Sequence, residues 1–196
     1  MREVEVKGIV PDIAAARAAL VEAGAELVYR GRLEDKRYDS SERALALRDH
    51  VLRLRVYRDA AVRAMLDWKG PTTYQDGYKV REELSVTLGD PDALAQMLDR
   101  LGYVVTREID REIEQYTVAG ATVRLEVYPR MDVLAEVEGE PEAIERAITL
   151  LRVPRASFTT ERLPDFVRHF EDRTGQRAAI CDRELTGDYR YSPTDA

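Results

Sequence analysis

The residues that first suggest chemistry lie in the stretch EVEVK, at positions 3–7. Glu3, Glu5 and Lys7 alternate with two valines, which is the period of a β-strand, so their charged side chains share one face. Two carboxylates at that spacing repel each other unless a bound cation or a raised pKa relieves the repulsion. The stretch therefore predicts a strand with a cation-binding face.

Five later segments repeat this alternation of apolar and charged residues: VLRLRV, LDWKG, VREELSV, VRLEV and LAEVE. The strands near the two ends supply the carboxylates Glu3, Glu5, Glu126, Glu136 and Glu138. The central strands supply the cations Arg53, Arg55, Lys69 and Arg81, with Arg107 or Arg111 from a long later strand. Clustered carboxylates need a divalent cation, and clustered cations need a multiply charged anion. A polyphosphate with Mg²⁺ or Mn²⁺ satisfies both sets.

The elements that must position these side chains are strands of one sheet. An antiparallel sheet with a dry face under helices and a wet face in solvent explains any one of these strands. Six strands that place ionised residues on the second face favour closure of the sheet. Closure lets the charged faces line a lumen and removes exposed strand edges. We therefore predict an α+β fold, a closed antiparallel β-barrel with helices packed outside.

The expected helices follow recurring boundary signals. Pairs of proline and aspartate at positions 11–12 and 90–91 each open a stretch of about three turns that ends at a glycine. Two more helices are expected over EAIERAITLL and LPDFVRHFEDRTG. No linker divides the chain, so we predict one domain over residues 1–175 and a C-terminal tail over residues 176–196.

The composition narrows the classes of function. The 196 residues are 44% hydrophobic and carry a formal net charge of −7, unlike general nucleic-acid or anionic-membrane binders, whose affinity comes from a basic surface. The apolar runs are too short to cross a bilayer, and the acidic start does not resemble a secretory leader. The lone Cys181 excludes an internal disulfide and a cysteine-based zinc site. We expect a cytoplasmic protein with a small-molecule ligand and no nucleic-acid or membrane partner, and a homodimer stays open.

In order and spacing, these segments resemble the CYTH superfamily, the triphosphate tunnel metalloenzymes. EVEVK is similar to the family's Glu-x-Glu-x-Lys signature, LRLR to its paired-arginine strand and WKGP to its lysine strand. LEVYPRMDVLAEVEG resembles its acidic strand and closing Glu-x-Glu strand, and ASFTTERLPDF its C-terminal aromatic helix. The resemblance spans roughly residues 1–175 and implies a closed eight-stranded antiparallel barrel, the triphosphate tunnel.

The resemblance also implies roles for the residues at matching positions. A catalytic Mg²⁺ or Mn²⁺ would be bound by Glu3, Glu5, Glu136 and Glu138. The triphosphate would be gripped by Lys7, Arg53, Arg55, Lys69, Arg81 and Arg111. Lys7 and Glu126 would take part in catalysis, with Glu126 as a further carboxylate near the metal, and Glu83 would face the lumen.

Three places depart from the family's pattern. The sixth strand carries Arg107 and Arg111, four residues apart, where the family has Lys-x-Arg. Both share a face, and we favour Arg111 because it lies nearer the following acidic strand. Arg37 and Tyr38 stand where the family has an aromatic pair, and Asp132 stands where glycine is common.

Two reactions and one binding function fit these residues. We favour metal-dependent hydrolysis of a triphosphate, such as inorganic tripolyphosphate, ATP or thiamine triphosphate, because no base-recognition cluster stands out. The alternative is a class IV adenylyl cyclase, in which the ribose 3′-hydroxyl of ATP attacks the α-phosphate and gives cyclic AMP and pyrophosphate. A non-catalytic binder of polyphosphate or phosphorylated ligands is disfavoured, because anion binding alone would not need the Glu-x-Glu pairs.

Overall fold

The structure is a computed structural model that describes residues 2–59 and 62–189. The strands are β1 (Arg2–Ile9), β2 (Glu26–Ser40), β3 (Val51–Arg58), β4 (Arg63–Lys69), β5 (Thr73–Gln75), β6 (Tyr78–Leu88), β7 (Tyr103–Val118), β8 (Ala121–Val127), β9 (Leu134–Glu138) and β10 (Phe158–Thr159). The helices are α1 (Ile13–Glu22), α2 (Pro91–Arg100), α3 (Pro141–Leu151), α4 (Leu163–Thr174) and α5 (Asp182–Thr186), with 3-10 turns η1 (Ala46–Arg48) and η2 (Arg155–Ser157).

The strands close into a barrel. Across the described residues the sheet order is β10-β1-β9-β8-β7-β2-β3-β4-β6-β5, and β1 also pairs with β6. That pairing, with Glu3 opposite Arg81, closes a ring of eight antiparallel strands, while β5 and β10 extend beyond it. The predicted closed eight-stranded antiparallel barrel in an α+β fold is therefore confirmed.

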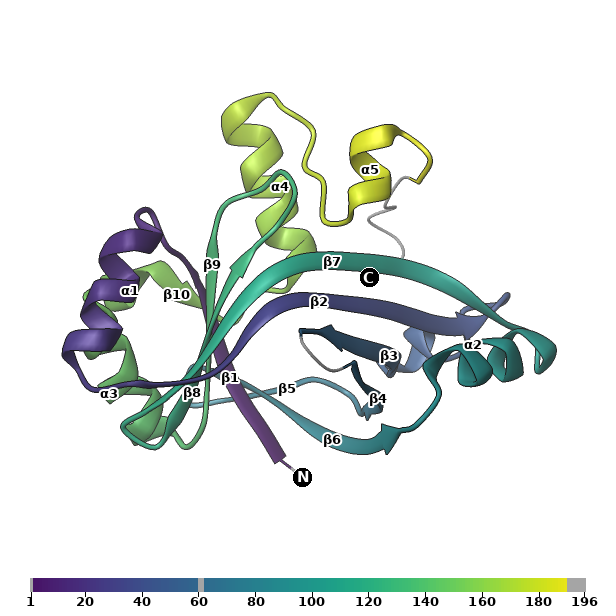
Figure 1. The fold of residues 1–196 in the computed structure, drawn as a ribbon, viewed down its shortest axis with the longest axis horizontal. Coiled ribbons are helices and arrows are strands. Elements are labelled where there is room, and N and C mark those ends of the chain that lie inside the picture. The colour runs from purple at the N-terminus through teal and green to yellow at the C-terminus, as the bar shows by residue number, and fades with distance from the viewer. Residues whose placement is uncertain (1, 60–61, 190–196) are drawn as a thin grey trace.

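The longest strands, β2 and β7, run side by side along the molecule and join its two ends (Figure 1). The register of this pair shifts between Leu27 and Tyr29, and again between Arg37 and Tyr38. At the second shift Arg37 pairs with Arg107 and Tyr38 with Val105, so Thr106 is an extra residue on β7. Such a bulge bends a strand and redirects its side chains.

The alternation of each strand separates two environments, as β1 illustrates. Val4 and Val6 are 4% and 1% exposed and belong to the largest apolar cluster, which also contains residues of α1 and α3. Glu3 and Glu5, on the opposite face, are each 6% exposed. Both faces of β1 are therefore buried, one under helices and the other towards the barrel lumen.

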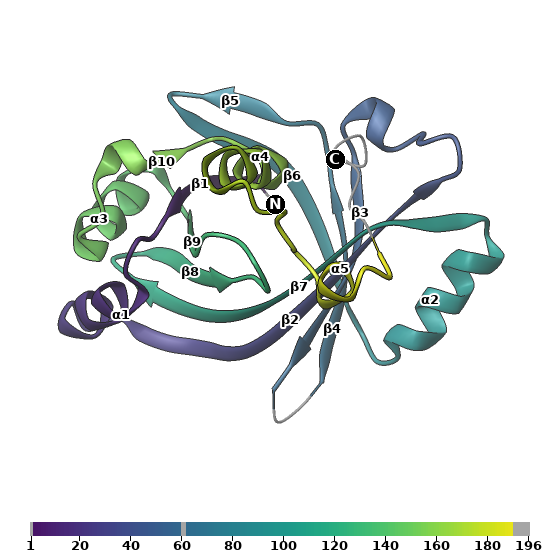
Figure 2. The same cartoon turned by 90° about the horizontal axis from the view of Figure 1, so that it is seen from above.

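The other helices cover different parts of the barrel. Leu98 of α2 packs on the outer face of β3 with Leu54 and Val56, at the end away from α1 and α3 (Figure 1). Phe166 of α4 belongs to a cluster with Ile109, a β7 residue on the same strand face as the charged residues. Seen from above, α4 lies over the ring of strands (Figure 2). It therefore covers one mouth of the barrel.

The C-terminal part of the described chain packs on this end. Ala179 forms a bridge with Arg130, and the Asp110 amide donates to the carbonyl of Ile180 (2.8 Å). Cys181 is a buried free thiol. Residues 190–196 of the predicted tail lie outside the described residues, and the domain boundary at residue 175 stays a prediction.

In the described ranges, no helix is long and apolar enough to cross a membrane.

The close approach of β1 and β10 gives a stability prediction. A Cβ on Gly8 would lie 2.7 Å from the Ser157 carbonyl oxygen, which is backbone and cannot rotate away. We expect Gly8→Ala to lower the free energy of unfolding by about 1–3 kcal/mol. Gly89→Ala is the matched control, because its Cβ meets nothing within 4 Å. Chemical denaturation that showed equal stability for the two variants would contradict the argument.

Candidate active site

Two cavities occupy the lumen. One lies beneath the start of α4 and is lined by Leu163 and Pro164, and the other lies beside the start of β1 and is lined by Glu3. They share the lining residues Arg53, Arg55, Lys69 and Glu136. Both cavities therefore meet the same central layer of charged side chains.

The two cavities differ in charge. The cavity beneath α4 is lined by ten cations, namely Lys7, Arg37, Arg53, Arg55, Lys69, Lys79, Arg81, Arg107, Arg111 and Arg162, and by five carboxylates. The cavity beside the start of β1 is lined by five cations and five carboxylates, the latter being Glu3, Asp67, Glu83, Glu136 and Glu138. The first cavity therefore attracts anions, and most of the predicted metal ligands border the second.

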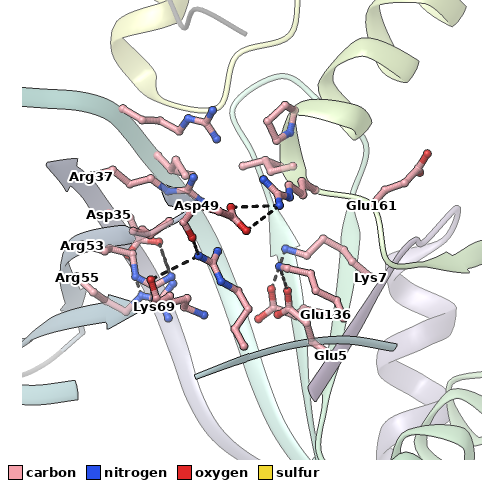
Figure 3. A pocket seen from close by; sticks show the side chains of 18 of the residues that line it. Glu5, Lys7, Asp35, Arg37, Asp49, Arg53, Arg55, Lys69, Glu136 and Glu161 are labelled. Carbon is pink, nitrogen blue, oxygen red and sulfur yellow. Dashed lines mark hydrogen bonds and ion pairs between the residues drawn. The ribbon is translucent and has the colours of Figure 1, made fainter. Parts of the chain in front are cut away.

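All six predicted triphosphate-binding residues line the cavity beneath α4: Lys7, Arg53, Arg55, Lys69, Arg81 and Arg111. Figure 3 shows Arg53 and Arg55 on one side of this cavity and Lys7 on the other, with Asp49 and further lining side chains between them. The choice between Arg107 and Arg111 was too narrow, because both side chains line the cavity and Arg107 is 0% exposed. The structure thus brings the predicted cations together.

Asp35, which the sequence analysis did not single out, orients three of the arginines. Its oxygens accept hydrogen bonds from Arg55 Nε and Nη2 (both 2.8 Å) and from Arg111 Nη1 (3.0 Å), and Arg53 Nη1 lies 3.9 Å away. Asp35 is 2% exposed. Burial alone would raise its pKa, but these guanidinium groups hold the pKa of Asp35 well below its usual range. Asp35 is therefore ionised at neutral pH and fixes the arginines.

A second buried carboxylate positions Arg53. Asp67 accepts from Arg53 Nη2 (2.6 Å) and Nε (2.9 Å), and from the Ser85 hydroxyl (2.7 Å). Burial opposes ionisation, but Arg53 and these hydrogen bonds lower the pKa of Asp67. Asp67 thus fixes the guanidinium group of Arg53 through Nε and Nη2, while the side chain borders both cavities.

Glu126 and Lys7 form a third buried group. Glu126 is 1% exposed and accepts from Arg111 Nε (2.9 Å) and the Tyr128 hydroxyl (2.8 Å). Lys7 Nζ lies 2.8 Å from Glu136 and 3.6 Å from Glu126. Despite burial, these carboxylates raise the pKa of Lys7 above its usual value, so Lys7 is a cation at neutral pH and cannot act as a base.

The four predicted metal ligands are close enough to influence one another. Burial, then the carboxylates of Glu3 and Glu136, raise the pKa of Glu138 to about 7, and Glu5 contributes as well. Among the described residues, however, no three acidic, histidine or cysteine side chains are arranged to hold a metal ion.

Lysine side chains form ion pairs with three of these carboxylates. Lys69 Nζ donates to Glu3 Oε1 (2.5 Å), Lys79 pairs with Glu5, and Lys7 and Arg124 pair with Glu136. Glu3 Oε2 is buried and has no hydrogen-bond partner, and Glu138 has no ion pair within residues 2–59 and 62–189. We call these two carboxyl groups, of Glu3 and Glu138, the acidic corner.

Arg81 differs from the other predicted cations. Its guanidinium donates to the backbone carbonyls of Gly70 (2.7 Å) and Asp49 (2.6 Å), so it ties together two loops at the mouth. The Asp49 side chain accepts hydrogen bonds from the Thr72 amide (2.6 Å) and from Nη2 of Arg162 (3.2 Å). Arg162 is the residue immediately before α4. Arg81 thus lines the cavity and also supports its rim.

The cavity residues to which the sequence analysis gave no binding role obey the same period as those it found. Asp35 and Arg37 alternate along β2, and Lys79 is two residues from Arg81 along β6. Arg124 stands two residues before Glu126. The signal was present in the alternation, and in β2 an irregular composition obscured it.

Comparisons with known proteins agree with this geometry. Residues 1–148 match the CYTH domain. A protein from Vibrio parahaemolyticus, described as a candidate adenylate cyclase, has a similar fold (TM-score 0.73, 18% identity, 85% of this chain and 97% of that chain). PH1819 from Pyrococcus horikoshii OT3 is 27% identical (TM-score 0.68, 82% of this chain and 94% of that chain).

A further similar structure comes from Hippeastrum. It is a candidate adenylyl cyclase described as having a dominant triphosphatase activity (TM-score 0.61, 18% identity, 89% of this chain and 96% of that chain). At that identity the likeness concerns the fold alone. The comparison with curated proteins gives no match. The CYTH domain match covers well over half of the residues of this chain, and the strands close into the expected barrel. The chain therefore belongs to the CYTH domain family.

Proposed function

We propose that the protein hydrolyses a triphosphate inside the lumen with the help of Mg²⁺ or Mn²⁺. The observation that carries the proposal is the division of the lumen into a cavity rich in guanidinium and ammonium groups and an adjoining acidic corner. Membership of the CYTH family implies a triphosphate ligand. A triphosphate with a divalent cation neutralises both regions at once.

The acidic corner fits a divalent cation by its donor set. Glu3 Oε2 is a buried oxygen without a hydrogen-bond partner, and the pKa of Glu138 is raised because burial and nearby carboxylates disfavour its charge. Carboxylate oxygens are the ligands that Mg²⁺ prefers, and a cation would relieve this repulsion. We assign Glu3 and Glu138 as its primary ligands, with Glu5 and Glu136 beside them.

The ion pairs of the lumen suggest that metal and triphosphate bind together. Lys69 and Lys79 now neutralise Glu3 and Glu5. An incoming triphosphate attracts these flexible ammonium groups, and their movement exposes carboxylates to a cation. By linkage, each ligand then raises the affinity for the other by the same factor.

The chain's residues divide the work of the reaction. Arg53, Arg55 and Lys69 bind the phosphate oxygens and hold the phosphate chain in line. Lys7, kept protonated, neutralises charge at the opposite wall, and Glu126 orients Arg111 as a positioning residue. When bound, a divalent cation supplies Lewis-acid polarisation of the phosphoryl oxygens.

The experiment that tests this proposal is a product assay. The protein is incubated with tripolyphosphate, ATP and thiamine triphosphate, each with Mg²⁺ or Mn²⁺, and the products are separated. Phosphate released from a triphosphate supports hydrolysis. Cyclic AMP with pyrophosphate would instead establish the adenylyl cyclase, and tight binding without any product would establish the non-catalytic binder.

Loss of one arginine should weaken substrate binding. Because hydrogen bonds between charged groups contribute about 1.5–3 kcal/mol, Arg53→Ala is expected to raise KM roughly tenfold to a hundredfold. The change leaves Asp67 buried without its partner, so the double variant Arg53→Ala/Asp67→Ala is the matched control. Steady-state kinetics should show the same rise for both, and an unchanged KM in the double variant would remove Arg53 from the binding residues.

A further inference from the structure

Arg37 and Arg107 line the cavity beneath α4 but are not among the six predicted triphosphate-binding residues. They pair directly across β2 and β7, at the position where the register of the two strands shifts. Arg53 is the β3 partner of Arg37, so three arginines stand in a row across three neighbouring strands.

Arg37 differs from the neighbouring arginines of the lumen wall in its hydrogen-bond partners. Arg53 and Arg55 each have a buried aspartate, and Arg111 has two carboxylates. Arg37 has a buried Nε without a hydrogen-bond partner. Burial, then the charges of Arg107 and Arg53, hold the pKa of Arg37 well below its usual range. An arginine held among like charges is most readily stabilised by an added anion.

The position of this pair relative to the triphosphate-binding residues determines where an added anion would lie. Arg37 lies two residues beyond Asp35 along β2, which is about 6.6 Å of strand, on the side of the loop that carries Asp49. Figure 3 shows Arg37 above Asp35, Arg53 and Arg55 on the same wall of the cavity. An anion at Arg37 therefore adjoins the phosphates held by Arg53 and Arg55, in the direction of the mouth.

The charge of the pair favours a phosphate over a carboxylate. A terminal phosphate carries about −1.5 to −2 charges at pH 7 and three acceptor oxygens, which suits two guanidinium groups. A carboxylate brings only one charge. The geometry points to a fourth phosphate subsite formed by Arg37 and Arg107, so that the preferred substrate is a linear inorganic polyphosphate of at least four phosphates. This inference rests on the proposed function for the site at which the other three phosphates bind.

The test compares tetrapolyphosphate with tripolyphosphate on the full chain. Binding is measured by calorimetry and kcat/KM by phosphate release with Mg²⁺. The wild-type protein should bind tetrapolyphosphate at least about tenfold more tightly than tripolyphosphate, the effect of one or two charge-assisted hydrogen bonds. Arg37→Gln should reduce this preference to about onefold, and Arg37→Lys should retain part of it.

Arg30→Gln is the matched control, because Arg30 lies on the same strand but pairs with Glu114 outside the lumen. It should keep the wild-type preference. Equal affinity of the wild-type protein for both anions, or an equal loss of both in Arg37→Gln, would overturn the subsite. If binding shows the preference but no metal supports phosphate release, the subsite stands and the proposed hydrolysis fails. The melting temperature of Arg37→Gln shows whether the variant is folded.

Discussion

Replacement of Glu138 by glutamine is expected to abolish turnover and, at the same time, to stabilise the metal-free protein. The carboxylate is one of two open donors in the acidic corner, so its loss should lower kcat about a thousandfold, or roughly 4 kcal/mol of transition-state stabilisation. Without metal, however, its charge is unfavourable, and the neutral amide avoids this cost. Kinetics with Mg²⁺ or Mn²⁺ and denaturation in a chelator measure the two effects.

The stabilisation has a defined pH dependence. The pKa of Glu138 is raised in the folded protein to about 7, above its value near 4.3 in the unfolded chain. The folded state therefore retains a proton that the unfolded state loses, and wild-type stability falls as pH rises from about 4 to 7. Glu138→Gln should exceed the wild type by about 3–4 kcal/mol at pH 8 and match it near pH 4. A variant that was less stable than the wild type at pH 8 would show that the charge of Glu138 does not destabilise the folded protein.

Replacement of Asp35 by asparagine should be the most damaging single change to the unliganded barrel. It would leave the guanidinium groups of Arg55 and Arg111 buried without their shared counter-ion. Breaking such a pair costs about 3–5 kcal/mol, which for a chain of this length lowers the melting temperature by roughly 6–20 °C. Thermal unfolding monitored by circular dichroism measures the loss.

Two controls separate electrostatics from packing at Asp35. The double variant Asp35→Asn/Arg55→Gln removes one unpaired charge and should recover part of the stability. Because the pKa of Asp35 is depressed, its contribution is present above about pH 4 and is lost as pH falls below that value. The gap between wild type and Asp35→Asn should therefore shrink in acid. A gap that stayed constant with pH would assign the effect to packing instead.

The fold could be predicted from the sequence because alternation and charge sorting reinforce each other in several strands. Glu3, Arg53, Lys69 and Glu138 each stand on the face opposite an apolar residue, and all four border the lumen cavities. What alternation cannot supply is the partner of each charge, because partners come from different strands. Asp35 became important only when the β2–β3 register placed it opposite Arg55.

The mouth of the tunnel was beyond prediction for a related reason. Asp49 lies in a left-handed conformation after η1 and joins Thr72 and Arg162, residues from three distant segments. No local sequence pattern predicts contacts between residues so far apart in the chain. The favoured choice of Arg111 over Arg107 similarly assumed that one residue would suffice, whereas no register shift separates the two, so both lie on the same face of β7 and line the cavity.

The closure of the barrel through β1 makes the site dependent on the order of folding. β1 pairs with β6 from the middle of the chain and with β9 from beyond it, so that Glu5 stands opposite Glu138. These contacts have large sequence separation, which slows folding because long loops must close first. During synthesis the acidic corner cannot assemble until β9 has left the ribosome. Acquisition of affinity for the proposed divalent cation would therefore report the pairing of β1 with β9, which closes the barrel, in a folding experiment.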